Sequence, residues 1–165
     1  LRDADFLFLA TDSIQSRLIF NALVHQFLIP GVQVGVKIHA DHSSHEIGDI
    51  IAVTRPVLPF ASGGCLHCHE LIPASRLQEE ALTQEERRTQ RYIEAEEVAE
   101  PSVITLNAAS VSPATNLFFM MMTGLHSQET KLRHQLNFVH EQQILEVKPR
   151  ANKDCFDCSD HHRSR

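Results

Sequence analysis

The sequence predicts an α/β protein in which helices pack on a mixed sheet. Three observations lead to this fold class. A short apolar run, Phe6 to Ala10, is followed at once by a helical pattern, so a strand leads directly into a helix. Alternating apolar and polar residues then predict two strands that form a hairpin. A loop, a second apolar helix and two short closing strands complete the order β-α-β-β-loop-α-β-β, with no internal repeat.

The first predicted helix covers residues 13–28. Its apolar residues recur at helical spacing, and they are Ile14, Leu18, Ile19, Ala22, Leu23 and Phe27. Four polar residues lie four positions apart and therefore share one stripe, namely Ser13, Arg17, Asn21 and His25. Because so apolar a helix is expected to be buried, the stripe should meet protein partners rather than bulk water.

The next two strands are predicted at 32–38 and 49–57. Gly35 lies inside the first of them, which indicates either close approach of another backbone or a ligand, or simply a weakened strand. The turn between the strands carries three histidines, His39, His42 and His45. No cysteine and no regular ligand spacing accompanies them, so a solvated hairpin is favoured over a metal site.

A charged stretch, residues 75–98, follows these strands and is interpreted as a solvated crossover segment. A helix is then predicted between Pro101 and Gly124, with Ser112 as a candidate cap and Pro113 in the first turn. Its core residues would be Leu117, Phe118, Met120, Met121 and Leu125.

The last secondary structure predicted is a closing hairpin. Apolar and polar residues alternate weakly at 136–140 and again at 143–147. Alternation over two short neighbouring runs is typical of paired strands. We therefore expect a closing hairpin here, followed by a polar tail that carries the final cysteine pair.

Composition limits the classes of function. A chain of 165 residues with 42% hydrophobic and 22% charged residues is typical of one globular domain. The net charge of −6 argues against nucleic acid as a partner. No apolar run is long enough to span a bilayer and no secretory signal is present, so we expect a cytoplasmic protein without a membrane partner. The start at Leu1 indicates a piece of a longer polypeptide.

The four cysteines form two pairs with the same spacing, Cys65-x-x-Cys68 and Cys155-x-x-Cys158, which we call the first and second knuckles. In a cytosolic chain this pattern indicates a metal site before it indicates disulfides. Four thiolates match the tetrahedral preference of zinc and leave no open position for water, so the zinc would be structural. The alternative is a thioredoxin-like redox motif, but neither pair opens an obvious helix.

Asp12 lies where the first strand passes into the first helix. Ligands of open α/β sheets bind at the carboxyl ends of strands, so Asp12 occupies a suitable corner for chemistry. The residues alone favour a simpler role, in which Asp12 caps the helix. The two roles do not exclude each other.

The stretch from Ala10 to Asn21, A-T-D-S-x-x-x-R-x-x-x-N, resembles the T-D-N/S-x-x-x-R-x-x-x-N segment of ThiF/MoeB/HesA-type adenylyltransferases. These are bacterial relatives of ubiquitin-activating enzymes. Later features follow the order of that family over nearly the whole chain. They are Ile29-Pro30, a strand with Gly35, C-L-x-C at 65–68, P-S-V-I-x-L-N at 101–107, an apolar helix closing at Thr123-Gly124, and a final C-x-x-C.

The resemblance implies that residues 1–165 are the C-terminal part of such a domain, the second half of a Rossmann-like mixed sheet with packed helices and a four-cysteine zinc site. The family's glycine-rich nucleotide loop is absent, since no G-x-G-x-x-G occurs here. By resemblance, Asp12 acts near Mg²⁺ and the ATP phosphates, while Arg17 and Asn21 hold the fold together beneath the site. Alone, this segment should not catalyse.

The implied activity is ATP-dependent adenylation of the C-terminal carboxylate of a ubiquitin-like or sulfur-carrier protein, in a homodimer. The tail of that protein would lie near Asp12 and Gly35. Residues 71–100 contain no cysteine, so covalent transfer on this segment is not expected. The alternative is a non-catalytic, zinc-stabilised scaffold or pseudo-enzyme half that binds a ubiquitin-like partner. A nicotinamide-dependent enzyme is disfavoured because no dinucleotide fingerprint is present.

Overall fold

The computed structural model describes residues 3–41, 46–59, 63–82, 103–125 and 133–159. Its five strands form one sheet in the order β1-β2-β3-β4-β5. The strands are β1 (Leu7–Leu9), β2 (Gly31–Asp41), β3 (Glu46–Val57), β4 (His134–Phe138) and β5 (Gln143–Val147). The helices are α1 (Ile14–Gln26), α2 (Ala74–Ala81) and α4 (Ile104–Thr123). The α/β class and the mixed sheet predicted from the sequence are thereby confirmed.

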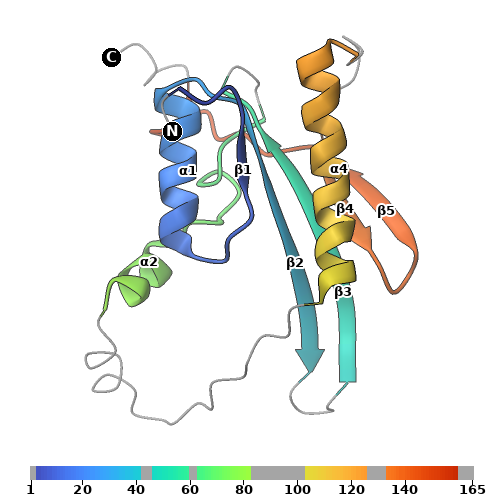
Figure 1. Ribbon diagram of the computed structural model, residues 1–165. Coiled ribbons are helices and arrows are strands. Elements are labelled where there is room, and N and C mark those ends of the chain that lie inside the picture. The colour runs from blue at the N-terminus through green and yellow to red at the C-terminus, as the bar shows by residue number, and fades with distance from the viewer. Residues whose placement is uncertain (1–2, 42–45, 60–62, 83–102, 126–132, 160–165) are drawn as a thin grey trace.

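Strand β1, helix α1 and strand β2 form a β-α-β unit in which β1 pairs with β2 in parallel (Figure 1). The crossing helix is what allows two consecutive strands to run parallel. Gly31 at the start of β2 permits the close packing, because a side-chain carbon there would lie 2.7 Å from Phe20 Cζ and 2.8 Å from the Leu7 carbonyl oxygen. The unit therefore fixes α1 firmly against the sheet.

The remaining strands pair antiparallel, β2 with β3, β3 with β4 and β4 with β5. Strands β2 and β3 are longer than the predicted strands because both extend into the expected turn. A register shift between Ile38 and Ala40 interrupts their pairing. Strand β5 forms the outer edge, and all five of its residues are exposed.

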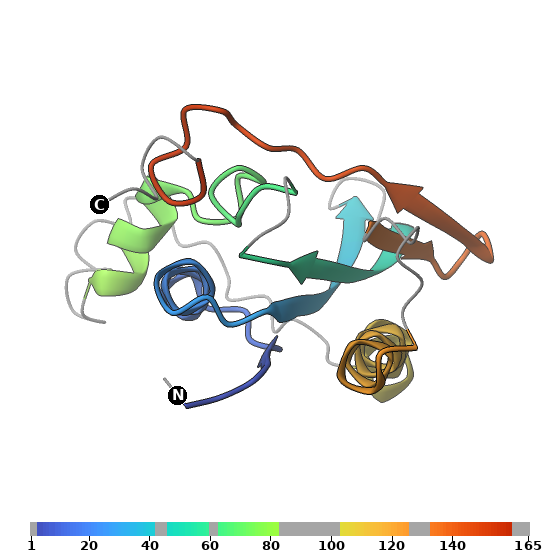
Figure 2. The same ribbon diagram turned by 90° about the horizontal axis from the view of Figure 1, so that it is seen from above.

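The two faces of the sheet carry different layers (Figure 2). On one face, α1 packs over a core cluster made of Leu7, Leu9, Ile14, Phe20, Val24, Ile29, Val57, Leu66 and Ile72. On the other face, α4 packs over Val32 and Val34 through Ala114. Because side chains alternate between the faces of a strand, the odd-numbered residues of β1 contribute to the α1 layer. The segment after β5 returns to this layer, where Arg150 contacts His69.

Helix α4 differs from its prediction at the start. It begins at Ile104, so Pro113 lies in its interior and Ser112 does not cap it. The proline signal was misleading because tertiary packing of the neighbouring Ala114, which is fully buried, outweighs the local preference. The end was predicted correctly, since Gly124 adopts a left-handed conformation with φ of 69°.

The predicted core of α4 was wrong for two residues. Met120 and Leu125 are exposed, whereas Leu117 packs against the buried cluster under the helix. Sequence periodicity could not separate these positions, because apolar residues occupy nearly every place from 117 to 122. The face that packs on the sheet is therefore known only from the folded chain.

Aromatic contacts connect α4 to the first strand. Phe118 forms edge-to-face contacts with Phe6 and Phe8, at centroid distances of 5.2 and 5.6 Å. Phe119 and Met122, in contrast, are exposed. Apolar side chains on the outer face of α4 are thus left uncovered by the described residues.

Helix α2 was not predicted. It occupies the start of the charged stretch, has no fully buried residue and contains Leu77 as its only large apolar side chain, so its polar composition concealed it. Leu77 nevertheless packs against the α1 core cluster. The rest of the predicted crossover segment lies outside the described residues. Within the described residues, no helix combines the length and apolar character needed to cross a membrane.

Candidate metal centre and the strand-to-helix corner

The two knuckles meet although they lie far apart in the sequence. The four cysteine Sγ atoms all lie within 4.8 Å of one another. Cys65 Sγ is 3.6 Å from Cys155 Sγ, and Cys68 Sγ is 3.4 Å from Cys158 Sγ. Within the first knuckle the two sulfurs are 3.9 Å apart, and none of the four cysteines forms a disulfide. This geometry supports the prediction that these four residues could hold one metal ion.

Backbone turns shape each knuckle around its sulfurs. In the first knuckle, the His69 amide donates a hydrogen bond to the Cys65 carbonyl at 3.2 Å. In the second, the Ser159 amide donates to the Cys155 carbonyl at 3.1 Å. The same five-residue turn therefore closes both knuckles, and each presents its two sulfurs on one side.

The first knuckle touches the segment that follows β5. His69 Nε2 donates to the carbonyl oxygens of Gly63 (3.0 Å) and Arg150 (3.1 Å). Gly64 adopts φ of 76°, and a side-chain carbon there would overlap the Arg150 carbonyl oxygen. Glycine is therefore required at position 64 both for its backbone conformation and for this close approach.

The cysteine cluster favours a negative charge on one sulfur. Hydrogen bonding from Cys158 lowers the pKa of the Cys65 thiol to about 4, although burial opposes this shift. The pKa of Cys158 is raised, first because of its hydrogen bond with Cys65 and second because of burial. A thiolate is the form of cysteine that binds a metal ion. The donor set thus suits a soft or borderline divalent cation.

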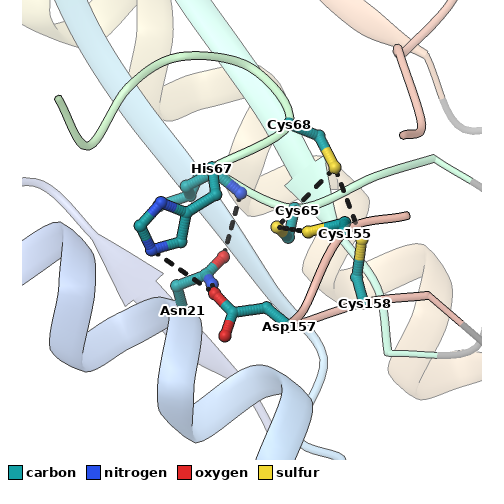
Figure 3. A network of polar contacts seen from close by, with 8 residues as sticks. Asn21, Cys65, His67, Cys68, Cys155, Asp157 and Cys158 are labelled. Carbon is teal, nitrogen blue, oxygen red and sulfur yellow. Dashed lines mark hydrogen bonds and ion pairs between the residues drawn. The ribbon is translucent and has the colours of Figure 1, made fainter. Parts of the chain in front are cut away.

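A polar network links the two knuckles to helix α1 (Figure 3). Asn21 is fully buried, with 0% of its surface exposed. Its Oδ1 accepts a hydrogen bond from the Leu66 amide at 2.9 Å, and its Nδ2 donates to Asp157 Oδ2 at 2.7 Å. His67 Nε2 lies 3.4 Å from the same Asp157 oxygen. Leu66 and His67 belong to the first knuckle, and Asp157 belongs to the second.

The strand-to-helix corner presents Asp12 to solvent. Asp12 is exposed and lies between β1 and α1, but it does not cap the helix. The cap is Ser13, whose Oγ accepts a hydrogen bond from the Ser16 amide at 3.1 Å. The capping alternative for Asp12 is therefore wrong. Its carboxylate lies beyond the carboxyl end of β1, at the corner where the sequence predicted it.

Glu80 from α2 completes the first turn of α1. Its carboxylate accepts hydrogen bonds from the amides of Ile14 (2.7 Å) and Gln15 (2.9 Å), and from Ser13 Oγ (3.3 Å). These backbone hydrogen bonds lower the pKa of Glu80. The first turn of α1 contains no acidic residue of its own, so Glu80 supplies the negative charge that a helix N-terminus favours. No pattern in the sequence indicated this contact.

The predicted polar stripe of α1 does meet protein partners. Ser13 contacts Glu80 at one end of the stripe. One turn further on, Arg17 Nη1 donates to the Leu71 carbonyl at 3.3 Å. Asn21 continues the stripe toward the knuckles, as described above. Helix α1 is therefore held along most of its length by polar contacts with later segments of the chain.

Basic side chains lie beside the first knuckle. Arg55 Nη1 donates to Gln33 Oε1 at 2.8 Å, and burial lowers the pKa of Arg55 to about 10. His134 is buried, and its ring contacts that of His69 at 4.5 Å between centroids. Burial and the neighbouring positive groups together hold the pKa of His134 well below that of a free histidine.

The remaining residues singled out by the sequence have other positions. His39 is exposed, while His42 and His45 lie outside the described residues. Gly35 lies near a side chain rather than a backbone, since a carbon added there would be 3.2 Å from Gln33 Nε2. Among the described residues, the four cysteines form the only group suited to hold a metal ion.

No protein-family model and no curated protein matches the sequence. Several solved structures share the fold. A crystal structure of E. coli MccB with ATP matches at 14% identity and a TM-score of 0.56, covering 94% of this chain and 40% of that one. A second E. coli MccB structure, with AMPCPP and selenomethionine MccA, matches at 12% identity and a TM-score of 0.56, with the same coverage.

A second protein shares this fold. The heterocyclase TruD matches at 14% identity and a TM-score of 0.55, covering 95% of this chain and 22% of that chain. At these identities the likeness establishes the fold. The chain spans less than half the length of each of these proteins.

Proposed function

We propose that this chain is the C-terminal part of a ThiF/MoeB/HesA-type domain that adenylates a carboxylate with ATP. The observation that carries the proposal is the exposed Asp12 beyond the carboxyl end of β1, in a fold shared with MccB, which has been crystallised with ATP. The order of sequence motifs from Ala10 to Cys158, which resembles that of the family, is an independent support. The other contacts to the nucleotide would come from sequence outside these residues.

The chemistry explains the need for a carboxylate at this corner. In adenylation, a substrate carboxylate oxygen attacks the α-phosphorus of ATP, an acyl–phosphate bond forms and the bond to pyrophosphate breaks. Magnesium, when bound, neutralises the charge on the phosphate oxygens, and it requires one or two protein carboxylates. Asp12 fits this role because it is exposed and is not used as a cap.

The substrate would be the C-terminal carboxylate of a ubiquitin-like or sulfur-carrier protein. The MccB structure that contains both AMPCPP and MccA supports this, because a protein of this fold has been crystallised with a nucleotide analogue and a second molecule. The chain contains no cysteine outside the two knuckles. This agrees with release of the adenylate to a separate acceptor, without covalent transfer on this segment.

The four cysteines are proposed to hold one structural zinc ion. Zinc–sulfur bonds of about 2.3 Å in a tetrahedron place the sulfurs about 3.8 Å apart. The sulfur–sulfur distances of 3.4, 3.6 and 3.9 Å fit that geometry. Four protein ligands would leave no position for water, so the ion would stabilise the fold rather than take part in adenylation.

Replacement of Asp12 tests the proposed nucleotide role. In the full-length protein, Asp12→Ala should reduce ATP–pyrophosphate exchange by at least about a hundredfold, because a lost metal carboxylate removes several kcal/mol of charge stabilisation. Asp5→Ala is the matched control, since it removes an exposed carboxylate that precedes β1 instead of following it. Unchanged exchange in Asp12→Ala would show that the assignment is wrong. Absence of exchange in the unmodified protein would favour the scaffold alternative.

Metal analysis tests the zinc proposal. We expect one zinc ion per folded, reduced chain, and its removal by a chelator should lower the free energy of unfolding by up to about 10 kcal/mol. Cys155→Ser should lower the zinc stoichiometry. The control is Ser159→Ala, directly after the second knuckle, because the Ser159 Oγ has no hydrogen-bond partner among the described residues. A folded, reduced sample without bound metal would contradict the assignment.

A further inference from the structure

Asn21 forms hydrogen bonds with both knuckles from a single position on α1. Its two polar groups are used in opposite senses, since Oδ1 accepts from the Leu66 amide and Nδ2 donates to Asp157. The residue is buried, so both groups must be satisfied by protein. Its partners are the residues that directly follow Cys65 and precede Cys158. Any separation of the knuckles would therefore break one of the two hydrogen bonds.

We infer that Asn21 is a positioning residue that couples the metal centre to helix α1. The inference rests on the proposed metal centre and goes beyond it, because it assigns a residue that is not a ligand. Partners that orient metal ligands influence affinity strongly. Asn21 would hold the two knuckles at the separation that the metal requires, and the bound metal would in turn hold α1.

The coupling extends to the corner that carries Asp12. Helix α1 runs from its first turn beside Asp12, past Arg17 and its contact with the Leu71 carbonyl, to Asn21. Because a helix is a rigid element, a constraint on Asn21 also restrains the first turn. Metal binding should therefore slow hydrogen exchange of the α1 amides as well as that of the knuckles.

The opposite senses of the two hydrogen bonds allow a direct test. Asn21→Asp has the same shape and still accepts from the Leu66 amide, but it places a carboxylate against the Asp157 carboxylate. Adding Asp157→Asn restores a donor between the two side chains with its direction reversed. A purely steric role for Asn21 would not distinguish these variants, because all of the side chains have nearly the same volume.

The experiment measures zinc affinity of the full-length protein by competition with a chromophoric chelator, together with hydrogen exchange of α1. Asn21→Asp should bind zinc about tenfold to a hundredfold more weakly, and its α1 amides should exchange faster in the presence of zinc. The double variant Asn21→Asp/Asp157→Asn should recover most of the affinity and protection. Asn116→Asp, at an exposed position of α4, is the matched control.

The outcomes separate this inference from the metal proposal. If the unmodified protein binds no zinc, the proposal of a metal centre is wrong, and the proposed coupling to α1 is wrong as well. If it binds zinc and Asn21→Asp binds equally well, the coupling is wrong while the centre stands. Should Asn21→Asp fail to fold, the double variant decides: recovery of folding and zinc binding supports the coupling, and failure to recover overturns it.

Discussion

Some polar side chains of this protein are exposed to solvent, whereas others form contacts that stabilise the fold. Asp12 is exposed after the end of β1, whereas Asn21 is buried between α1 and the knuckles. Both belong to the same short sequence motif. Their difference in exposure follows from their positions relative to helix α1. Asn21 lies on the stripe that faces the first knuckle, whereas Asp12 precedes the first turn.

His134 should make the protein sensitive to acid. Burial, together with the nearby charges of His69 and Arg55, lowers its pKa to about 3 in the folded state, against about 6.5 for an unperturbed histidine. As the pH falls below about 6.5, the unfolded chain binds a proton that the folded chain does not, so the free energy of unfolding decreases. The neutral form of His134 therefore contributes fully to the free energy of unfolding above that pH. This contribution is lost as the pH falls toward the folded-state pKa.

His134→Phe keeps an aromatic ring against His69 and removes the titrating group. We expect this variant to lose less of its free energy of unfolding than the unmodified protein when the pH is lowered from about 7.5 to about 5. Urea denaturation at several pH values measures the difference. His140→Phe, at an exposed position, is the control and should leave the pH dependence of the free energy of unfolding unchanged. If the free energy of unfolding had the same slope against pH in both variants, the role of His134 would be contradicted.

Among contacts between elements, the approach of the first knuckle to the segment after β5 stands out. Gly64 and Gly124 both have positive φ, but only Gly64 lies against another backbone. At Gly124 a side-chain carbon would have nothing within 4 Å. Comparing alanine substitutions at the two glycines therefore separates the free-energy cost of a positive φ from the free-energy cost of the close approach.

Gly64→Ala should destabilise the protein more than Gly124→Ala. Each substitution places a side chain at positive φ, which costs about 1–2 kcal/mol, and the contact with the Arg150 carbonyl adds to this at position 64. Gly64→Ala should also weaken zinc binding, since displacement of residue 150 moves the second knuckle. Chemical denaturation and chelator competition measure both effects. Equal losses at the two positions would show that the close approach has no energetic weight.

In the molecule taken as a whole, the outer face of α4 is an apolar surface that the described residues leave uncovered. Phe119 is 57% exposed, and Met120 and Met122 are nearly as exposed. Neighbouring apolar side chains of this kind are typical of an interface. We propose that this face contributes to a two-fold homodimer, as the sequence resemblance implies.

Light scattering of the full-length protein should give the mass of a dimer at micromolar concentration. Phe119→Glu should shift the mass to that of the monomer, because a charge would be buried without a partner in the interface. Ile144→Glu on the exposed edge strand β5 is the control, with a similarly exposed starting residue. A monomeric unmodified protein would remove the dimer proposal.

Local patterns along the chain were sufficient to predict most of the elements. The periods of apolar residues predicted β1, α1, the β2–β3 pair and the closing hairpin, and the two C-x-x-C spacings identified the four cysteines. The stripe of α1 could be predicted to need partners because its residues recur every four positions. The start of α4 could not be predicted in this way, since packing on the sheet overrides the local signal of Ser112-Pro113.

Contacts between residues that lie far apart in the sequence became known only from the folded chain. No local pattern shows that Glu80 reaches the amides of α1, that Asn21 joins both knuckles, or that Gly64 touches residue 150. Each of these contacts joins segments brought together by burial of the shared core, and hydrophobic burial is not directional along the chain. The positions of Asp12 and the cysteines could therefore be singled out as candidates from the sequence itself, whereas the polar contacts that join α1 to both knuckles depend on tertiary packing.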